Sequence, residues 1–301
     1  MALREALILA DVLAGTGGTL AARAAGEIAF TGVSIDSRTT PPGALFVAVR
    51  GPRFDGHDFL AEAARRGARA ALVHRDAEAP AGLPLVRVAD TTKGLADLAR
   101  HVRREAALPV VAVTGSVGKT TTKDMTAHLL ATRGPVLKTE GNLNNQYGLP
   151  LTLLRLKPEH TAAVLELGMS APGEIRALST LAEPDVATIT RIAPVHLEFF
   201  PSVEAIAEAK AEILEGLRPG GAAVLNGDDP RVRAIGERFR GRVVWFGRDR
   251  RCEVSAENET VDGGDTSRLS SGLSSDDRST RASRGSGVRP GSSSPRCRGR
   301  R

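Results

Sequence analysis

Apolar runs alternate with amphipathic segments along most of the chain. Near the N-terminus, the runs at 44–49 ("ALFVAV") and 69–74 ("RAALVH") predict short strands, and "FLAEAARRG" between them predicts a helix that ends at Gly67. From about residue 107, helical stretches alternate with the apolar runs "VVAVT", "AAVLEL", "VATIT", "AAVLN" and "VVWFG". Continuous apolar strands that alternate with helices are typical of a parallel sheet covered on both faces.

These two rhythms predict two α/β domains. The segment "TTKGLADLARHVRREAALP" predicts a helix that links them. We place a small N-terminal domain in residues 1–84, a larger domain with a mostly parallel sheet in residues 85–266 and a tail in residues 267–301. With 301 residues, 41% of them hydrophobic, the chain is long enough for two buried cores.

The tail differs from the rest of the chain in composition. Eleven of its residues are Ser, five are Gly and nine are Arg, with two Asp and no Lys or Glu. Such a segment buries too little apolar surface to offset chain entropy, so we expect it to be disordered. It resembles either a linker or an out-of-frame reading of a GC-rich gene, and the abrupt end of the strand–helix pattern favours the second interpretation.

The excess positive charge also lies in this tail. Its nine Arg and two Asp give +7, whereas the whole chain carries +6, so residues 1–266 sum to −1. A basic tail without aromatic residues for base stacking is not typical of a nucleic-acid-binding face. We therefore expect no nucleic-acid partner.

The remaining bulk features indicate a soluble cytoplasmic protein. The N-terminus has no clear basic region or cleavage site, and no run of about eighteen apolar residues predicts a membrane span. The cysteines, Cys252 and Cys297, are too few for a disulfide framework and lack metal-ligand spacing.

The segment "VVAVTGSVGKTTTKDM" at 110–125 has the features of a phosphate-binding loop. A buried strand ends in a Gly-rich turn that opens a helix, where backbone N–H groups and the helix dipole favour an anion. Lys119 would neutralise the β- and γ-phosphates, and the Thr120 hydroxyl would ligate Mg²⁺. Val113 stands where the strict Walker spacing has its first Gly, so the motif is the shorter T-G-x-x-G-K-[ST]. It predicts binding of a nucleoside triphosphate.

Three further residues are candidates for a metal site. Glu166 ends the run "TAAVLELG", where a carboxylate binds Mg²⁺ or pairs with an arginine. Lys210 lies on the apolar stripe of the helix "VEAIAEAKAEILEGL", so its amine must reach solvent, lose its proton or be modified, for instance by CO₂ to a metal-binding carbamate. His196 follows another strand and is either a ligand or structural.

Three polar segments are candidate ligand contacts. "TEGNLNNQYGLP" at 139–150 is rich in amides, which orient phosphate or peptide oxygens but also form ordinary turns. "LNGDDPR" at 225–231 either holds adenine or ribose or is a simple Asp-Pro turn. Near the N-terminus, Asp36, Arg38, His57 and Asp58 lie in segments that could hold a polar, phosphate-bearing ligand.

Taken together, eight ordered segments between residues 30 and 230 resemble the Mur ligases, and most closely the branch that joins D-alanyl-D-alanine to UDP-N-acetylmuramoyl-tripeptide. The segments are "GVSIDSR", "GALFVAVRGPRFDGHDF", "AVTGSVGKTTTKDM", "GNLNNQYGLPLTLL", "AVLELGMSAPGEI", "HLEFF", "EAKAEILEGL" and "LNGDD". The resemblance implies a monomeric bacterial enzyme of cytoplasmic peptidoglycan precursor synthesis. It would use ATP and Mg²⁺ to activate the tripeptide carboxylate as an acyl phosphate.

The resemblance also implies roles for individual residues. Lys119, Lys210 and His196 would be catalytic, with Lys210 carbamylated, and Thr120, Glu166, His196 and Lys210 would serve metal ions. The expected ATP contacts are Thr114, Gly115, Ser116, Val117, Gly118, Lys119, Thr120, Thr121, Asn226 and Asp228. The expected contacts with the UDP-sugar tripeptide are Ser34, Asp36, Ser37, Arg38, Phe54, Gly56, His57, Asp58, Asn142 and Asn145.

The chain departs from the family pattern after "RVVWFG". The family carries a third, Rossmann-like domain that closes over the nucleotide, and we expect no counterpart here, with the likeness ending by about Thr266. Three alternatives to an active ligase of this branch remain: a remnant that binds nucleotide and UDP-sugar without turnover, the sister ligase that adds the third amino acid, and an unrelated P-loop GTPase or kinase.

Overall fold

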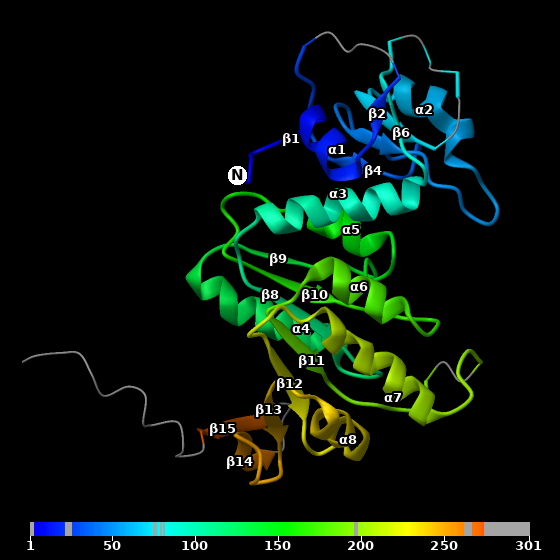
Figure 1. The fold of residues 1–301 in the computed structure, drawn as a ribbon. Coiled ribbons are helices and arrows are strands. Elements are labelled where there is room, and N and C mark those ends of the chain that lie inside the picture. The colour runs from blue at the N-terminus through cyan, green and yellow to red at the C-terminus, as the bar shows by residue number, and fades with distance from the viewer. Residues whose placement is uncertain are drawn as a thin grey trace, which may run out of the picture.

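The computed structural model describes residues 3–21, 26–74, 77–78, 80, 82–195, 198–261 and 267–273, and beyond Ser255 it describes the backbone alone. Two sheets form two domains, and helix α3 (Thr91–Glu105) lies between them (Figure 1). Its N-cap is Asp90, whose carboxylate accepts hydrogen bonds from the backbone N–H groups of Thr92 and Lys93. The predicted linking helix is therefore confirmed.

The smaller domain is built on a five-stranded sheet in the order β2-β7-β6-β5-β4, parallel except for the antiparallel pair β2–β7. Its strands are β2 (Thr19–Leu20), β4 (Val33–Ser34), β5 (Leu45–Val47), β6 (Ala70–Val73) and β7 (Leu85–Arg87). A separate two-stranded pair joins β1 (Leu7–Ile8) to β3 (Ala29–Phe30). One face of the five-stranded sheet packs towards α1 (Leu9–Thr16) and α3, and the other towards α2 (Leu60–Arg65).

The larger domain is built on an eight-stranded sheet in the order β15-β14-β13-β12-β11-β8-β10-β9. All its pairs are parallel except the last hairpin, β14–β15. Its strands are β8 (Val110–Thr114), β9 (Val136–Lys138), β10 (Ala162–Glu166), β11 (Val186–Ile189), β12 (Ala222–Asn226), β13 (Arg242–Gly247), β14 (Val254–Val261) and β15 (Ser267–Leu273). The predicted parallel sheet is confirmed.

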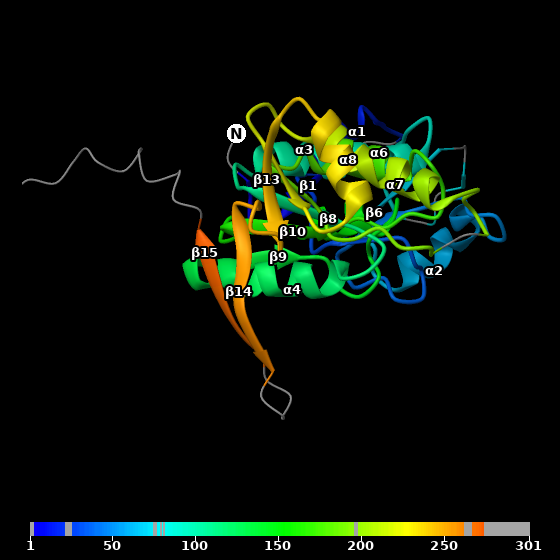
Figure 2. The ribbon, with the colours of Figure 1, turned by 90° about the horizontal axis from the view of Figure 1, so that it is seen from below.

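Helices cover both faces of this sheet. Helix α4 (Lys119–Leu130) lies on one face, and α6 (Glu174–Ala182), α7 (Val203–Ala211) and α8 (Pro230–Arg238) lie on the other (Figure 2). Among the described residues, the remaining helices are α5 (Gly148–Leu153) and three short 3₁₀ segments, η1 (Gly56–Phe59), η2 (Ala131–Arg133) and η3 (Glu212–Gly216). The winding of the chain changes direction at β8, since β9 and β10 lie to one side of it and β11 to the other. The carboxyl end of β8 is therefore the place where ligands bind in sheets of this kind.

The structure corrects two of the predicted boundaries. Strand β7 (Leu85–Arg87) pairs with β6, so the first sheet extends beyond residue 84. The tail was expected to be disordered from residue 267, but β15 (Ser267–Leu273) pairs antiparallel with β14. Composition misses such a strand because an open sheet edge pairs through its backbone groups whatever the side chains are. Residues 274–301, and Cys297 with them, lie outside the described residues.

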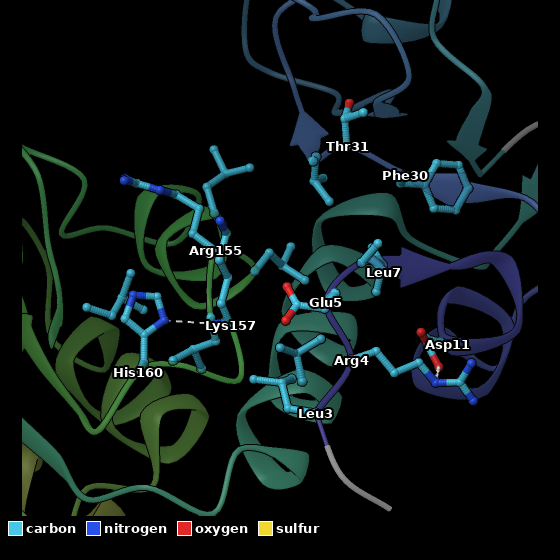
Figure 3. A pocket seen from close by; sticks show the side chains of 18 of the residues that line it. Leu3, Arg4, Glu5, Leu7, Asp11, Phe30, Thr31, Arg155, Lys157 and His160 are labelled. Carbon is cyan, nitrogen blue, oxygen red and sulfur yellow. Dashed lines mark hydrogen bonds and ion pairs between the residues drawn. The ribbon is translucent and has the colours of Figure 1, made fainter. Parts of the chain in front are cut away.

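A cavity of about 560 Å³ lies at the junction of the two domains, beside the N-terminal segment (Figure 3). Its lining includes Gly32 and His160, which precede β4 and β10, and also Leu137 of β9 and Leu143 of the loop that follows β9. The cationic side chains on its rim have acidic partners: Arg155 binds Glu140 at 2.7 Å, Arg4 lies 4.0 Å from Asp11 and Lys157 lies 3.8 Å from Glu159. This cavity lies at the seam between the domains, and its lining includes none of the phosphate-loop residues 115–119, all of which the structure describes.

Candidate functional site

The phosphate loop connects β8 to α4 and takes a path that only glycine allows at two places. Gly118 is the N-cap of α4 with φ +87°, and Gly115 has φ +149°. A Cβ at Gly115 would lie 1.9 Å from the Thr190 hydroxyl oxygen, so any side chain there would displace the loop. The first turn of α4 therefore points its backbone N–H groups at the space beyond the carboxyl edge of the sheet.

Lys119 starts α4 and bends back over the loop. Its amine donates a hydrogen bond to the Gly115 carbonyl at 2.9 Å. This contact holds the positive charge beside the backbone N–H groups of the turn. A bound triphosphate would exchange this carbonyl for stronger, charged acceptors.

Glu166 meets the phosphate loop at the end of β10, the strand next to β8. The Thr120 hydroxyl donates to one of its carboxylate oxygens at 2.8 Å, and the Asn144 amide donates to the other at 3.0 Å. The side chain is buried, with 3% of its surface exposed. The predicted juxtaposition of Thr120 and Glu166 is therefore present, and these two oxygen ligands fit the preference of Mg²⁺.

Asn144 was not among the predicted site residues. The loop at 139–150 carries four side-chain amides, and the sequence offered no reason to prefer Asn144 over Asn142 or Asn145. Asn145 instead accepts hydrogen bonds from Tyr147 N–H and Gly148 N–H, so its amide caps α5. Asn142 is exposed in the same loop.

A buried lysine supports Glu166 from behind. The Lys123 amine, on the inner side of α4, donates to the Thr139 carbonyl at 2.9 Å. The Thr139 hydroxyl in turn accepts a hydrogen bond from the backbone N–H of Glu166 at 3.0 Å. Loop 139–150 is thus tied both to α4 and to β10, which fixes the backbone from which Glu166 projects.

Lys210 and Lys119 line one cavity of about 430 Å³. Its other lining residues are Asn144, Asn145, Gln146, Tyr147, Gly168, Met169, Ser170, Glu174, Ala177 and Leu178. Lys210 lies on the apolar stripe and is buried, so its amine does not reach solvent, and among the described residues it has no hydrogen-bond or ion-pair partner. Burial, reinforced by the charge of Lys119, lowers the pKa of Lys210 to about 8.

The other predicted metal ligand, His196, lies outside the described residues. Within the part of the chain that the structure describes, no three His, Cys, Asp or Glu side chains gather into a metal-binding cluster. Thr120, Glu166 and Lys210 are therefore the predicted ligands whose positions are known.

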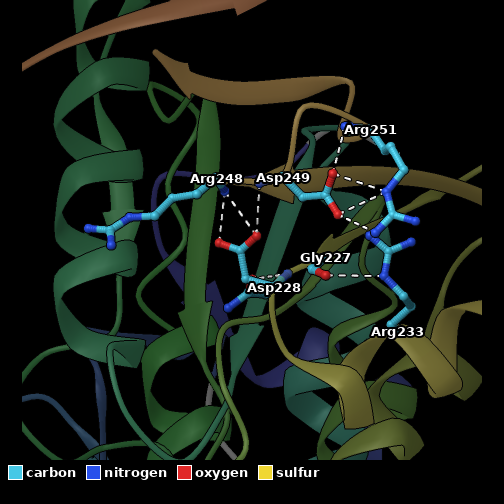
Figure 4. Close-up of polar contacts among 7 residues, drawn as sticks. Gly227, Asp228, Arg233, Arg248, Asp249 and Arg251 are labelled. Carbon is cyan, nitrogen blue, oxygen red and sulfur yellow. Dashed lines mark hydrogen bonds and ion pairs between the residues drawn. The ribbon is translucent and has the colours of Figure 1, made fainter. Parts of the chain in front are cut away.

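The turn after β12 lies beside the phosphate loop. The Asn226 amide donates to the Thr190 carbonyl at 2.8 Å and accepts from Asp228 N–H at 2.9 Å. The Asp228 carboxylate accepts hydrogen bonds from the backbone N–H groups of Arg248 and Asp249 (Figure 4). These two side chains shape the turn through contacts within the protein, and their predicted contact with ATP stays a prediction.

Arg233 packs against the back of the same turn. Its Nε donates to the Gly227 carbonyl at 3.1 Å (Figure 4). Its guanidinium lies 5.0 Å from the centre of the Trp245 ring. The turn is therefore held from both α8 and β13.

In the smaller domain, the predicted sugar-nucleotide residues gather after the carboxyl ends of β4 and β5. Arg38 binds the Asp36 carboxylate with its Nε and Nη2, which holds the pKa of Asp36 below its usual value. Ser34 stabilises the same turn, donating to the Asp36 carbonyl at 3.1 Å. Phe54 is 72% exposed at the tip of the neighbouring loop. An open aromatic face and an exposed guanidinium lie on one edge of the sheet.

The ring of His57 is not available to a ligand, contrary to its predicted role. It is fully buried, with Nδ1 2.6 Å from the Asp55 carboxylate and Nε2 accepting from the backbone N–H of His74 at 3.1 Å. His57 therefore holds the loop in place. Gly56 allows this loop to pack closely against the backbone at Val49, because a Cβ at position 56 would lie only 2.8 Å from the backbone nitrogen of Val49. No sequence pattern separates such a histidine from one that binds a ligand.

Comparison with known proteins identifies the family. The profile described as "Mur ligase middle domain" matches residues 113–277, and the profile "Mur ligase family, catalytic domain" matches residues 29–103. The chain belongs to the Mur ligase family. The first match extends beyond Thr266, where the likeness was expected to end, and so includes β15.

Within the Mur ligases, the chain is similar to enzymes of one branch. It is 45% identical to the UDP-N-acetylmuramoyl-tripeptide–D-alanyl-D-alanine ligase of Escherichia coli (strain K12) over 203 residues, 67% of this chain and 44% of that protein. A crystal structure of MurF from Acinetobacter baumannii superposes with a TM-score of 0.80 at 35% identity, covering 86% of this chain and 57% of that one. MurF from Thermotoga maritima in complex with ADP gives 0.72 at 36% identity, covering 80% and 55%.

The chain spans about half the length of the Mur ligases that it matches. Among the described residues, none of the helices combines the length and apolar character that a membrane span needs.

Proposed function

We propose that this chain carries the UDP-sugar and ATP modules of a ligase that joins D-alanyl-D-alanine to UDP-N-acetylmuramoyl-tripeptide in peptidoglycan precursor synthesis. One observation carries the proposal: Lys119 and the buried Lys210 line one cavity with Asn144, whose amide binds the Glu166 carboxylate that also accepts from Thr120. The similarity to MurF enzymes supports the choice of substrates.

In this proposal the phosphate loop holds the β- and γ-phosphates of ATP. The N–H groups at the start of α4 and the Lys119 amine would bind the phosphate oxygens. The tripeptide carboxylate would attack the γ-phosphorus to give an acyl phosphate and ADP, and the dipeptide amine would then displace phosphate. Two anions must approach each other in the first step, so the cationic lining provided by Lys119 lowers the repulsion between them.

Thr120 and Glu166 are the residues that would hold Mg²⁺. Their oxygens are already close together, and Asn144 keeps the carboxylate turned towards Thr120. When bound, the ion would supply positive charge to the phosphates. His196 and Lys210, the latter in a carbamylated form, would serve a second Mg²⁺. An amine with a pKa near 8 is partly neutral at physiological pH and so able to react with CO₂.

The smaller domain would hold the UDP-sugar. Arg38 is placed to contact a diphosphate, and the exposed ring of Phe54 to stack on a base. Both lie where the loops at the carboxyl edge of a parallel sheet bind ligands.

Calorimetric binding to the folded chain tests the proposal. We expect UDP-N-acetylmuramoyl-tripeptide to bind at least tenfold more tightly than the corresponding dipeptide, and MgATP more tightly than MgGTP. Preference for the dipeptide would favour the sister ligase, and preference for GTP without any UDP-sugar binding would favour an unrelated P-loop protein. Lys119→Ala should abolish MgATP binding and leave UDP-sugar binding unchanged.

Turnover separates an active ligase from a binding remnant. ADP release that depends on both the tripeptide and D-alanyl-D-alanine would establish ligation. Binding of both substrates without ADP release would assign this chain to the remnant alternative.

A further inference from the structure

We propose that Asp229 is a positioning residue that sets the shape of the phosphate loop from the turn after β12. It acts through the segment 190–193, which lies between that turn and the loop. The inference rests on the proposed nucleotide-binding function, and it gives an individual role to one residue of the segment 225–231, which the sequence singled out only as a whole.

Asp229 joins two elements with one buried carboxylate. One oxygen caps α8, accepting from Arg231 N–H at 2.9 Å and from Val232 N–H at 3.4 Å. The other accepts from the backbone N–H of Ile192 at 2.7 Å, across 37 positions of sequence. The residue is 7% exposed. A carboxylate this buried is stable because every contact is with an N–H donor and α8 presents the positive end of its dipole.

The segment that Asp229 holds provides acceptors to the phosphate loop. Ser116 donates its backbone N–H to the Arg191 carbonyl at 2.7 Å and its hydroxyl to the Ala193 carbonyl at 3.1 Å. The Thr190 hydroxyl donates to the Val117 carbonyl at 2.6 Å. The middle of the loop is therefore fixed by consecutive residues on both sides of Ile192.

Segment 190–193 makes a second hydrogen bond with the turn after β12. The Thr190 carbonyl accepts from the Asn226 amide, so the turn binds the segment at both Thr190 and Ile192. Asp229 fixes the turn to α8 and binds Ile192. A shift of the turn therefore moves the carbonyls on either side of Ile192, which accept the hydrogen bonds of Ser116. Nucleotide-base contacts at the turn and phosphate contacts at the loop are thereby coupled in one rigid path.

Substitution of Asp229 by Asn separates its two roles. The amide oxygen still caps α8, because Asn is as good an N-cap as Asp. The amide nitrogen then faces the N–H of Ile192, so a donor meets a donor and the segment is released. Asp229→Ser gives a second variant, which also caps the helix but is too short to reach Ile192.

Binding of magnesium triphosphate, measured by calorimetry, tests the inference, because inorganic triphosphate probes the phosphate loop without any base contact. We expect both Asp229 variants to bind it about tenfold more weakly than the unsubstituted chain, the loss typical of one charge-assisted hydrogen bond. Asp11→Asn is the matched control. Asp11 is also a buried helix-capping carboxylate, bonded to Ile8 N–H at 3.0 Å in the smaller domain, and its substitution should change triphosphate binding less than twofold.

A double-mutant cycle with Ser116→Ala distinguishes positioning from general destabilisation. If Asp229 acts in part through the hydroxyl contact of Ser116, the loss of triphosphate affinity in the double variant will be smaller than the product of the two single losses. Losses that multiply, or Asp229 variants that bind within twofold of the unsubstituted chain, would overturn the inference and leave the proposed function intact. Absence of triphosphate and ATP binding by the unsubstituted chain would instead remove the proposed function, and the inference with it.

Discussion

Lys210 and Lys119 line the same cavity, and the charge of Lys119 adds to the effect of burial in lowering the pKa of Lys210 to about 8. Two lysines in one cavity repel each other unless an anion lies between them or one of them is neutral. An anion bound in this cavity would therefore relieve the repulsion between the two amines. With a pKa of about 8, roughly one Lys210 amine in ten is neutral at pH 7 in the free chain.

Replacement of Lys210 by Met should stabilise the free chain. The folded state releases the Lys210 proton near pH 8, whereas the unfolded state releases it near the ordinary value of 10.5. Between these values the unfolded state binds more protons, so the stability of the unsubstituted chain rises with pH across this window. In CO₂-depleted buffer at pH 7, Lys210→Met should raise the free energy of unfolding by roughly 3 kcal/mol. The gain should shrink from pH 8 to 10.5, as followed by urea unfolding.

Lys123→Met is the matched control, because Lys123 is equally buried but its amine binds the Thr139 carbonyl. Its loss leaves a buried acceptor unpaired and should lower stability by about 1–3 kcal/mol. Destabilisation by Lys210→Met of the same size would show that the Lys210 amine has a partner in the folded chain, contrary to the lowered pKa.

A carbamate on Lys210 should be visible directly. In ¹³C-bicarbonate at pH 8, we expect a carbamate carbon signal by NMR that disappears in Lys210→Ala and persists in Lys123→Ala. The lowered pKa provides the neutral amine that reacts with CO₂. A signal that survives Lys210→Ala would assign the carbamate to another amine.

The sequence predicted the parts of this site that depend on local pattern. The run "VVAVT" became β8 and ended in the phosphate loop, and helical periodicity placed Lys210 on the apolar stripe of its helix, although it left open whether the amine reaches solvent. The sheet order brings Thr120 and Glu166 together, since β8 and β10 are neighbours with their carboxyl ends at one edge. Such features follow from local patterns, a continuous apolar run for β8 and a period of 3.6 for the helix of Lys210, because these patterns decide which faces of an element are buried.

The parts that depend on the path of a loop were not predictable. Asn144 reaches Glu166 while Asn145 caps a helix, and only the loop geometry separates the two amides. The contact between Asp229 and Ile192 joins residues far apart in sequence, and both ring nitrogens of His57 turn inward. Short-range sequence carries no signal for contacts of this kind.

Glu166→Gln should remove the effect of Mg²⁺ on ATP affinity. The change keeps the size of the side chain, and Asn144 can turn its amide to accept from the new Gln. Calorimetry of ATP binding with Mg²⁺ and with chelator should show a tenfold or larger loss of the Mg²⁺ enhancement. Metal-free ATP should bind slightly more tightly, because a negative charge has been removed.

Glu140→Gln is the control for this experiment. Glu140 is exposed, pairs with Arg155 and belongs to the same loop as Asn144, and its substitution should leave the Mg²⁺ enhancement unchanged. An enhancement of normal size in Glu166→Gln would remove Glu166 from the metal site.

Glu212→Ala should unfold more easily than Glu215→Ala, although both residues lie on η3 and both contact Arg176. The buried carboxylate of Glu212 accepts from Gly173 N–H at 2.9 Å and from the backbone N–H of Arg176 at 3.1 Å, so it caps α6 from another element. Glu215 is half exposed and forms only an ion pair with the Arg176 guanidinium. Urea unfolding should show a loss of about 2–4 kcal/mol for Glu212→Ala, because two N–H groups lose their acceptor, against less than about 1 kcal/mol for Glu215→Ala. Equal losses of stability in the two variants would mean that the hydrogen bonds from Glu212 to the start of α6 do not fix η3. Helix α7, which precedes η3 and carries Lys210, would then not be held against α6 by this cap.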